Sequence, residues 1–148
     1  MARLRIDRLG RKGGMLLALS AMPGSRGTAG ASRTSAASRV TVVAARAYVA
    51  ARPPGRLVGM LGTPDPAPDE ALVLLPCAAV HGVGLRARIA AVFVDGQGRV
   101  LRVVDPLPRR GASCRGAHAV IEAACGVLDL APGDQVWLTG ADLFPHAA

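Results

Sequence analysis

The chain has 148 residues, a net charge of +8 and 3% aromatic residues, and its length favours a single domain. No apolar run approaches the ~20 residues that cross a bilayer, which argues against an integral membrane protein. Three cysteines at unmatched spacings argue against a disulfide framework and favour a reducing compartment. We therefore expect a cytoplasmic protein.

The positive charge is concentrated in a basic tail, residues 1–39. This tail has eight basic residues and one acid, a balance of +7, whereas residues 40–148 have ten and nine, a balance of +1. Seventeen of the eighteen basic residues are Arg, a usage that a GC-rich genome explains. The tail has no aromatic residue to stack on bases, so its composition argues against nucleic-acid binding. We interpret it as a disordered extension; recruitment to anionic surfaces is a further hypothesis for it.

The run from Met15 to Met22 in this tail also resembles the apolar part of an export signal. The run has about the minimum length for such a signal, and Pro23 ends it. Export is therefore the alternative to a cytoplasmic location. A start codon placed too far upstream is another explanation of the tail.

The ordered domain is expected over residues 40–143. A candidate strand at 40–51 comes first, and prolines between residues 53 and 68 interrupt regular structure after it. Asp65, Asp69 and Glu70 in this Pro-rich stretch are interpreted as solvated charges. The short apolar run at 71–76 is consistent with a buried strand.

The clearest element is a β-hairpin with strands at 89–94 and 100–104. Its four-residue turn, Asp95–Gly98, needs a residue with positive φ, and we expect Gly98 to supply it. Residues 116–126 fit either a strand or a helix. A Pro-Gly-Asp turn precedes a last strand on which Trp137 is expected to be half-buried. The sum is a mainly β (α+β with little helix) domain, a compact β-sandwich or barrel-like sheet.

These segments together resemble the uncharacterised domain-of-unknown-function family 192. The similar stretches are "GRLVGMLG", "PCAAVHGVGLRARIAAVFVDGQGRVLRVV", "GAHAVIEAACG" and "PGDQVWL". The resemblance implies a compact β-rich fold and gives no reaction, cofactor or catalytic residue. Its motif positions in this chain are Arg56, Gly59, His81, Arg86, Asp95, Gly98, Glu122, Gly133 and Asp134.

The central motif of that family, His-Thr-x-x-Met-Arg-x-x-Ile-Asp, is incomplete in this chain. Gly82, Leu85 and Ala91 replace its usual Thr, Met and Asp. His81, Arg86 and Glu122 are the motif residues that we name as candidate binding positions. Ionisable side chains in apolar segments need partners when they are buried. These three residues would therefore form either a structural clasp or the floor of a small ligand site.

Two Cys-x3-His pairs, Cys77 with His81 and Cys114 with His118, raise the question of a metal site or a cysteine nucleophile. Residues four apart on an extended strand are about 13 Å apart, too far to bind one ion. We therefore expect no metal or cofactor. Cys114 or Cys125 could approach His81 through the fold, but no nucleophile signature surrounds any of the cysteines.

The preferred interpretation is a non-enzymatic binding or structural module whose partner is a protein or a small ligand. The alternative is a metal protein or cysteine-dependent enzyme that uses His81 with Cys77, Cys114 or Cys125.

Overall fold

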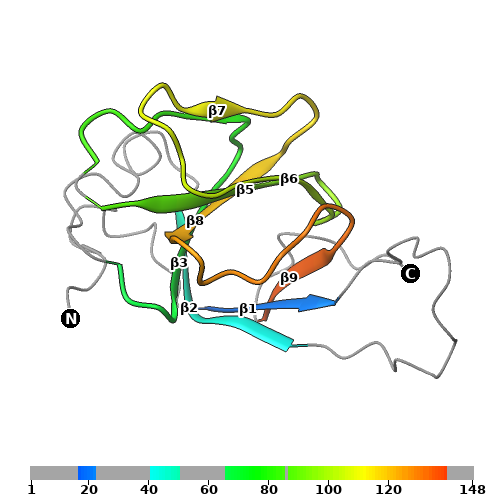
Figure 1. Cartoon of the computed structure of the whole chain (residues 1–148). Helices are drawn as coiled ribbons and strands as arrows, with labels where there is room; N and C mark the ends of the chain where they lie inside the picture. The colour runs from blue at the N-terminus through cyan, green and yellow to red at the C-terminus, as the bar shows by residue number, and fades with distance from the viewer. Residues whose placement is uncertain (1–16, 23–40, 51–65, 86, 140–148) are drawn as a thin grey trace, which may run out of the picture.

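The computed structural model describes residues 17–22, 41–50, 66–85 and 87–139, and these residues form strands and no helix. Seven strands make one sheet in the order β6-β5-β8-β3-β2-β1-β9, and β4 and β7 make a small second sheet (Figure 1). The mainly β class predicted from the sequence is confirmed. The strands are β1 (Leu17–Met22), β2 (Thr41–Ala50), β3 (Glu70–Leu74), β4 (Ala79–Val80), β5 (Ile89–Val94), β6 (Val100–Val104), β7 (Ala112–Ser113), β8 (Ala119–Ala124) and β9 (Gln135–Thr139).

The large sheet curves until its two outer strands meet. Strands β2 and β3 are parallel, and the other neighbours in the sheet are antiparallel. At the outer edges, Arg99 pairs with Gln135 in an antiparallel bridge. The amide of Val100 donates to the carbonyl of Asp134 over 2.8 Å, and the amide of Val136 donates to that of Gly98 over 2.8 Å. These bonds close the sheet into a barrel, the second of the two architectures expected.

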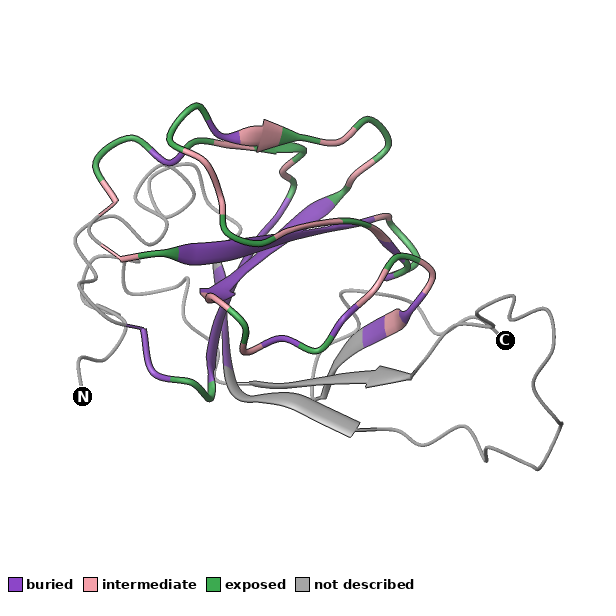
Figure 2. Ribbon diagram, viewed as in Figure 1, coloured by how far each residue is buried: buried purple, intermediate pink, exposed green. Residues whose placement is uncertain are grey.

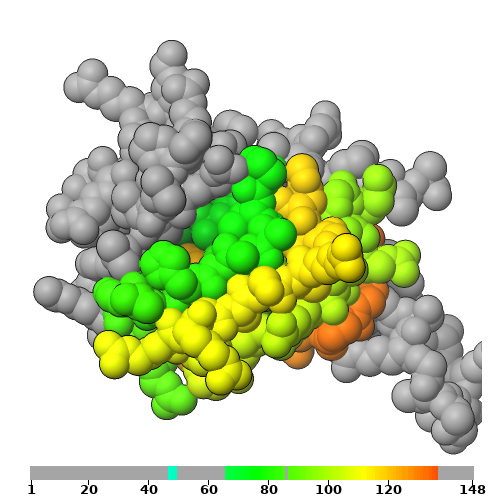
Figure 3. Space-filling view, turned by 90° about the horizontal axis from the view of Figure 1, so that it is seen from above, coloured from blue at the N-terminus to red at the C-terminus, as the bar shows by residue number. Residues whose placement is uncertain are grey.

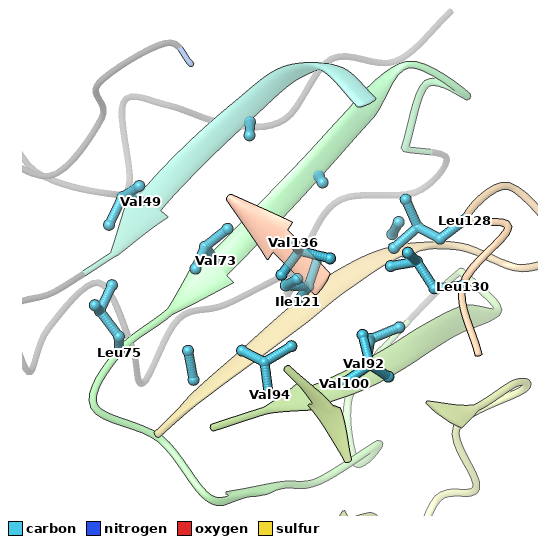
Figure 4. Packing of buried hydrophobic residues seen from close by; sticks show 14 residues of the cluster. Val49, Val73, Leu75, Val92, Val94, Val100, Ile121, Leu128, Leu130 and Val136 are labelled. Carbon is cyan, nitrogen blue, oxygen red and sulfur yellow. The ribbon is translucent and has the colours of Figure 1, made fainter. Parts of the chain in front are cut away.

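The interior of this barrel is filled from one face of the large sheet. Alternate residues of β3, β5 and β8 fill the interior together with Val100, Val136 and two leucines from the loop after β8. Figure 4 shows these apolar side chains pointing toward one another. Valine and isoleucine suit this position because their branched side chains pack well on a pleated surface. The interior is thus a packed core.

The other face of the sheet lies under the small sheet. The buried residues of this outer face form two clusters, Tyr48, Leu72, Leu74 and Ile89 in one and Ala91, Phe93 and Val120 in the other. Cys77, Val80 and Leu107 pack against both clusters. Figure 2 shows the buried strands β5 and β8 in purple beneath the half-buried and exposed β7 segment. The small sheet is therefore a cover over an apolar outer face.

Main-chain hydrogen bonds hold this cover in place. The amide of Cys77 donates to the carbonyl of His118, and the amide of Cys114 donates to that of Ala78, both over 2.9 Å. Between the cover and the barrel, the Nη1 atom of Arg102 on β6 donates to the carbonyl oxygen of Ser113 over 2.7 Å. The main-chain N–H and C=O groups of successive residues in a strand point to opposite edges. Because Cys114 bonds to β4, the carbonyl of Ser113 points away from β4, and the Arg102 guanidinium binds at this outer edge of β7.

Most of the predicted elements are confirmed. The hairpin strands have the expected bounds, and Gly98 has a φ of 79°. The segment at 116–126, which was ambiguous, contains a strand, β8, and Gly126 follows that strand with a φ of 73°. The side chain of Trp137 lies outside the described part of the structure. No described segment forms a helix that is long and apolar enough to cross a membrane.

The structure differs from the sequence prediction at residues 17–22, the part of the expected tail that the structure describes. Leu17–Met22, expected to be part of a disordered tail, forms β1 between β2 and β9. The physical reason is that this short, largely apolar run can complete the hydrogen-bonding edges of both neighbours. The ordered sheet therefore includes residues before the expected boundary at residue 40.

Candidate functional site

The outer face and its cover contain the candidate site residues that the structure describes. Glu122 lies on β8, where its register partners are Leu72 on β3 and Ala91 on β5. Its neighbours Ile121 and Ala123 point into the barrel, so the alternation of the strand directs Glu122 to the outer face. The residue is only 4% exposed. Glu122 is thus a buried carboxylate under the small sheet.

A second buried carboxylate on this face was missed by the sequence analysis. Glu70 was interpreted as a solvated charge, but it is 0% exposed. It is the first residue of β3, and the alternation of that strand places it on the covered face with Leu72 and Leu74. Its Oε2 atom accepts a hydrogen bond from the amide of Ala67 over 3.3 Å. Of the other two acids in that interpretation, Asp69 is exposed and Asp65 lies outside the described residues.

Glu70 and Glu122 are diagonal neighbours on the sheet. Leu72 pairs with Glu122, so Glu70, two residues earlier on β3, belongs to the next pair on the same face. Diagonal neighbours on paired strands are about 7–8 Å apart. The outer face therefore brings two acids close together within an otherwise apolar surface. No sequence signal identified this pair, because the pairing of β3 with β8 spans about 50 residues of chain.

His81 does not share the burial of Glu122. It follows β4 directly, is exposed, and its backbone packs closely against Gly111. The condition under which His81 would need a partner, burial of its side chain, is therefore not met, because a solvated imidazole needs none. Arg86, the third member of the predicted set, lies outside the described residues.

The position of the motif aspartate, which this chain lacks, is on β5. The aspartate of the motif follows Ile89 directly and therefore falls at Ala90 rather than at Ala91. Both alanines are buried, 2% and 0% exposed respectively. Ala91 is the register partner of Glu122 and lies on the covered face, whereas Ala90, the place of the motif aspartate, alternates to the barrel side of β5.

The two Cys-x3-His segments lie side by side in the structure. The small sheet pairs Ala79 with Ser113 and Val80 with Ala112, which aligns the two segments in opposite directions. Cys77 and Cys114 are partly buried against the outer-face cluster of Ala91, Phe93 and Val120, here called the Phe93 cluster. His81 and His118 are exposed. Among the described residues, no three His, Cys, Asp or Glu side chains are grouped as metal ligands would be. Here the repeated pattern serves main-chain pairing and apolar packing.

Cys125 lies beside an acid that makes its thiol less reactive. Burial of Cys125 raises its pKa above the ordinary 9.0, and the hydrogen bond and negative charge of Asp105 raise it further, while Arg88 lowers it. Asp105 is held there because its Oδ2 atom accepts a hydrogen bond from the amide of Gly126 over 2.8 Å. A nucleophilic cysteine needs a depressed pKa. The surroundings of Cys125 are therefore the opposite of those of an activated nucleophile.

We predict that Asp105→Asn lowers the pKa of Cys125 and increases its alkylation rate at a given pH. The measurement is the pH profile of iodoacetamide labelling, read by mass spectrometry, with Cys77 and Cys114 as internal controls. Because the pKa in the folded protein is raised above 9.0, the stability contributed by the protonated thiol is present below about pH 9 and is lost as the pH rises through the folded pKa. An unchanged Cys125 profile in the variant would contradict this role of Asp105.

The remaining motif positions that the structure describes lie in turns. In the hairpin turn, Oδ1 of Asp95 accepts hydrogen bonds from the amides of Gln97 and Arg99, each over 2.9 Å. Asp134 is 3% exposed, and its Oδ2 atom accepts from the amide of Ala131 over 2.8 Å. Gly133 between them in the closing turn has a φ of 93°, which favours glycine. Arg56 and Gly59 lie outside the described residues.

Fold and site together define a small closed β-sheet domain whose outer face is covered by a two-stranded sheet. A protein from Sinorhizobium meliloti 1021, described as a candidate transcription regulator, has a similar crystal structure, with a TM-score of 0.67, 14% identity and coverage of 89% of this chain and all of the other. A protein of unknown function from Novosphingobium aromaticivorans is also similar, with a TM-score of 0.63, 18% identity and coverage of 86% and 89%. No protein-family model and no curated protein matches the sequence. At these identities the likeness is one of fold, shared with uncharacterised bacterial proteins.

Proposed function

We propose that the chain is a non-enzymatic binding module, a divergent relative of domain-of-unknown-function family 192. The observation that carries this proposal is the state of its chemically reactive side chains. Two cysteines pack against the Phe93 cluster, the third has a raised pKa, and no described group of side chains is arranged to bind a metal. The packed barrel core adds support, because ligand sites are hollow and this interior is filled.

In this proposal the buried carboxylate of Glu122 stabilises the cover. A buried carboxylate is costly unless it is paired and hydrogen-bonded. We propose that Glu122 forms a clasp with Arg86, which keeps the segment between β4 and β5 against the outer face. The clasp stabilises the cover and leaves the exposed side of the small sheet for the partner.

The rival function is a metal protein or cysteine-dependent enzyme built on His81. A native mass spectrum of the full chain, purified without a tag under reducing conditions and then incubated with equimolar zinc, separates the two. The binding module predicts the mass of the polypeptide, or a multiple of it, after removal of excess zinc. One retained zinc per chain that is lost in both Cys77→Ala and His81→Ala would contradict the proposal. Retention unaffected by either substitution would assign the zinc to other residues and contradict it as well.

A further inference from the structure

Strand β7 is flanked by two tight turns that expose arginines. In the first turn the amide of Gly111 donates to the carbonyl of Pro108 over 2.8 Å, which places Arg109 and Arg110 at its two corners. In the second turn the amide of Ala117 donates to the carbonyl of Cys114 over 3.2 Å, which places Arg115 at a corner. All three arginines are exposed, as the central residues of a surface turn must be.

A fourth arginine lies between these two turns. Arg110 and Arg115 are five residues apart along an extended segment, and therefore at most about 17 Å apart. The Arg102 guanidinium reaches the middle of this segment, at the carbonyl of Ser113. A guanidinium has five N–H donors, and Arg102 is exposed, so donors remain for another acceptor. We call Arg102, Arg109, Arg110 and Arg115 the arginine row.

The segment that carries three of these four arginines has charges of one sign. Residues 106–121 contain three Arg and no Asp or Glu. Asp105, the acid nearest to this segment along the chain, lies beside Cys125 and accepts the amide of Gly126 after β8, and Glu122, the next acid after the segment, is buried on β8. Figure 3 shows the segment around β7, in yellow, crossing the upper face of the molecule. The arginines of this segment therefore give the face that carries β7 a positive charge.

We propose that the arginine row binds the phosphate backbone of nucleic acid, an inference that rests on the proposed binding module and names its partner. Duplex DNA carries one negative charge per ~1.7 Å of its axis, so a row with a span of up to about 17 Å can meet several phosphates. Guanidinium groups bind phosphate oxygens through paired hydrogen bonds.

Two observations select this partner and its mode of binding. Insertion into a lipid surface would draw on apolar side chains beside the charges, and Val83 is the one large apolar side chain that the described residues expose; attraction to lipid by charge alone is tested by the vesicle titration below. Base recognition by stacking would require exposed aromatics beside the row, and the two aromatic side chains that the structure describes, Tyr48 and Phe93, are both buried. We therefore assign the contacts of the row to the backbone, where they do not depend on the base sequence.

The test compares two double variants of the full chain. Arg110→Ala/Arg115→Ala removes two charges from the row, and Arg88→Ala/Arg99→Ala removes two exposed charges outside it. The basic tail is present in both, so its own contribution to binding is the same. The measurement is the anisotropy of a labelled mixed-sequence DNA duplex over a range of salt concentrations. A parallel titration uses vesicles of a neutral lipid mixed with phosphatidylserine.

We expect the row variant to lose about tenfold or more in DNA affinity. The slope of log K against log salt concentration should become less negative by about 1.8, the value for two phosphate contacts. The control variant should change this slope by less than about 0.5. Arg110→Lys/Arg115→Lys, which keeps the charge, should retain most of the affinity.

Equal losses in the row and control variants would overturn the inference, because net charge alone would then explain binding. Loss of vesicle binding with unchanged DNA binding in the row variant would also overturn it and identify a lipid surface as the partner. Either result is distinct from failure of the binding module itself, whose sign is zinc retained by Cys77 and His81.

Discussion

Replacing Gly111 by alanine is expected to detach the small sheet and to lower the free energy of unfolding by about 2–5 kcal/mol. Gly111 has a φ of +82°, and a Cβ atom there would lie 2.1 Å from the carbonyl oxygen of Val80 and 2.7 Å from Cα of His81. Both contacts are to backbone, so no side chain can rotate away. The segment before β7 must move away from β4, and the arginine row moves with it.

Gly116→Ala is the matched control for this prediction. Gly116 has a φ of +85°, and a Cβ atom there would meet nothing within 4 Å. Its cost is therefore only that of the left-handed backbone, about 1–2 kcal/mol. The measurements are chemical denaturation and hydrogen exchange of the Cys114 amide, which donates to Ala78. Equal destabilisation by the two substitutions would contradict the close approach at Gly111.

The second large effect is expected at Phe93, the largest fully buried side chain beneath the cover. Phe93 is 0% exposed, and Cys77, Cys114 and Leu107 pack against its cluster. Phe93→Ala should cost about 3–5 kcal/mol. The cavity forms directly beneath the small sheet. We therefore expect exchange of the Cys114 amide to accelerate more than exchange of the Ile121 amide in β8.

Val92→Ala provides the comparison for Phe93→Ala. Val92 is the preceding residue on β5, also 0% exposed, but it points into the barrel interior. Its loss should lower stability by roughly 2 kcal/mol and leave the ratio of the Cys114 and Ile121 exchange rates unchanged. A Phe93→Ala variant with the same ratio as Val92→Ala would contradict the assignment of Phe93 as the anchor of the cover.

Local chemistry made the hairpin and the closing turn predictable from the sequence. Asp95–Gly98 combines turn residues with apolar strands on both sides, and only glycine adopts the φ of Gly98 without strain. The Pro-Gly-Asp turn before β9 follows the same logic. In both cases a few adjacent residues determine the backbone, so no knowledge of distant partners is required.

The candidate site depends on the pairing of strands that are far apart in the sequence, so it was harder to predict from the sequence. Glu70 appeared to be a loop residue because its burial depends on the pairing of β3 with β8. The Cys-x3-His segments gave a motif signal, but only the register of β4 with β7 shows that their backbones meet. Strand β1 was assigned to the tail because a six-residue run has no signal of its own until two neighbours flank it.

The central claim is that the exposed side of the small sheet is the binding surface. The most direct measurement is a titration of the ¹⁵N-labelled full chain with a short DNA duplex, followed by amide chemical shifts. The account predicts that the largest shifts fall on residues 108–118 and on Arg102, with little change in the barrel strands β3 and β8. Shifts confined to residues outside the small sheet and the arginine row would contradict it.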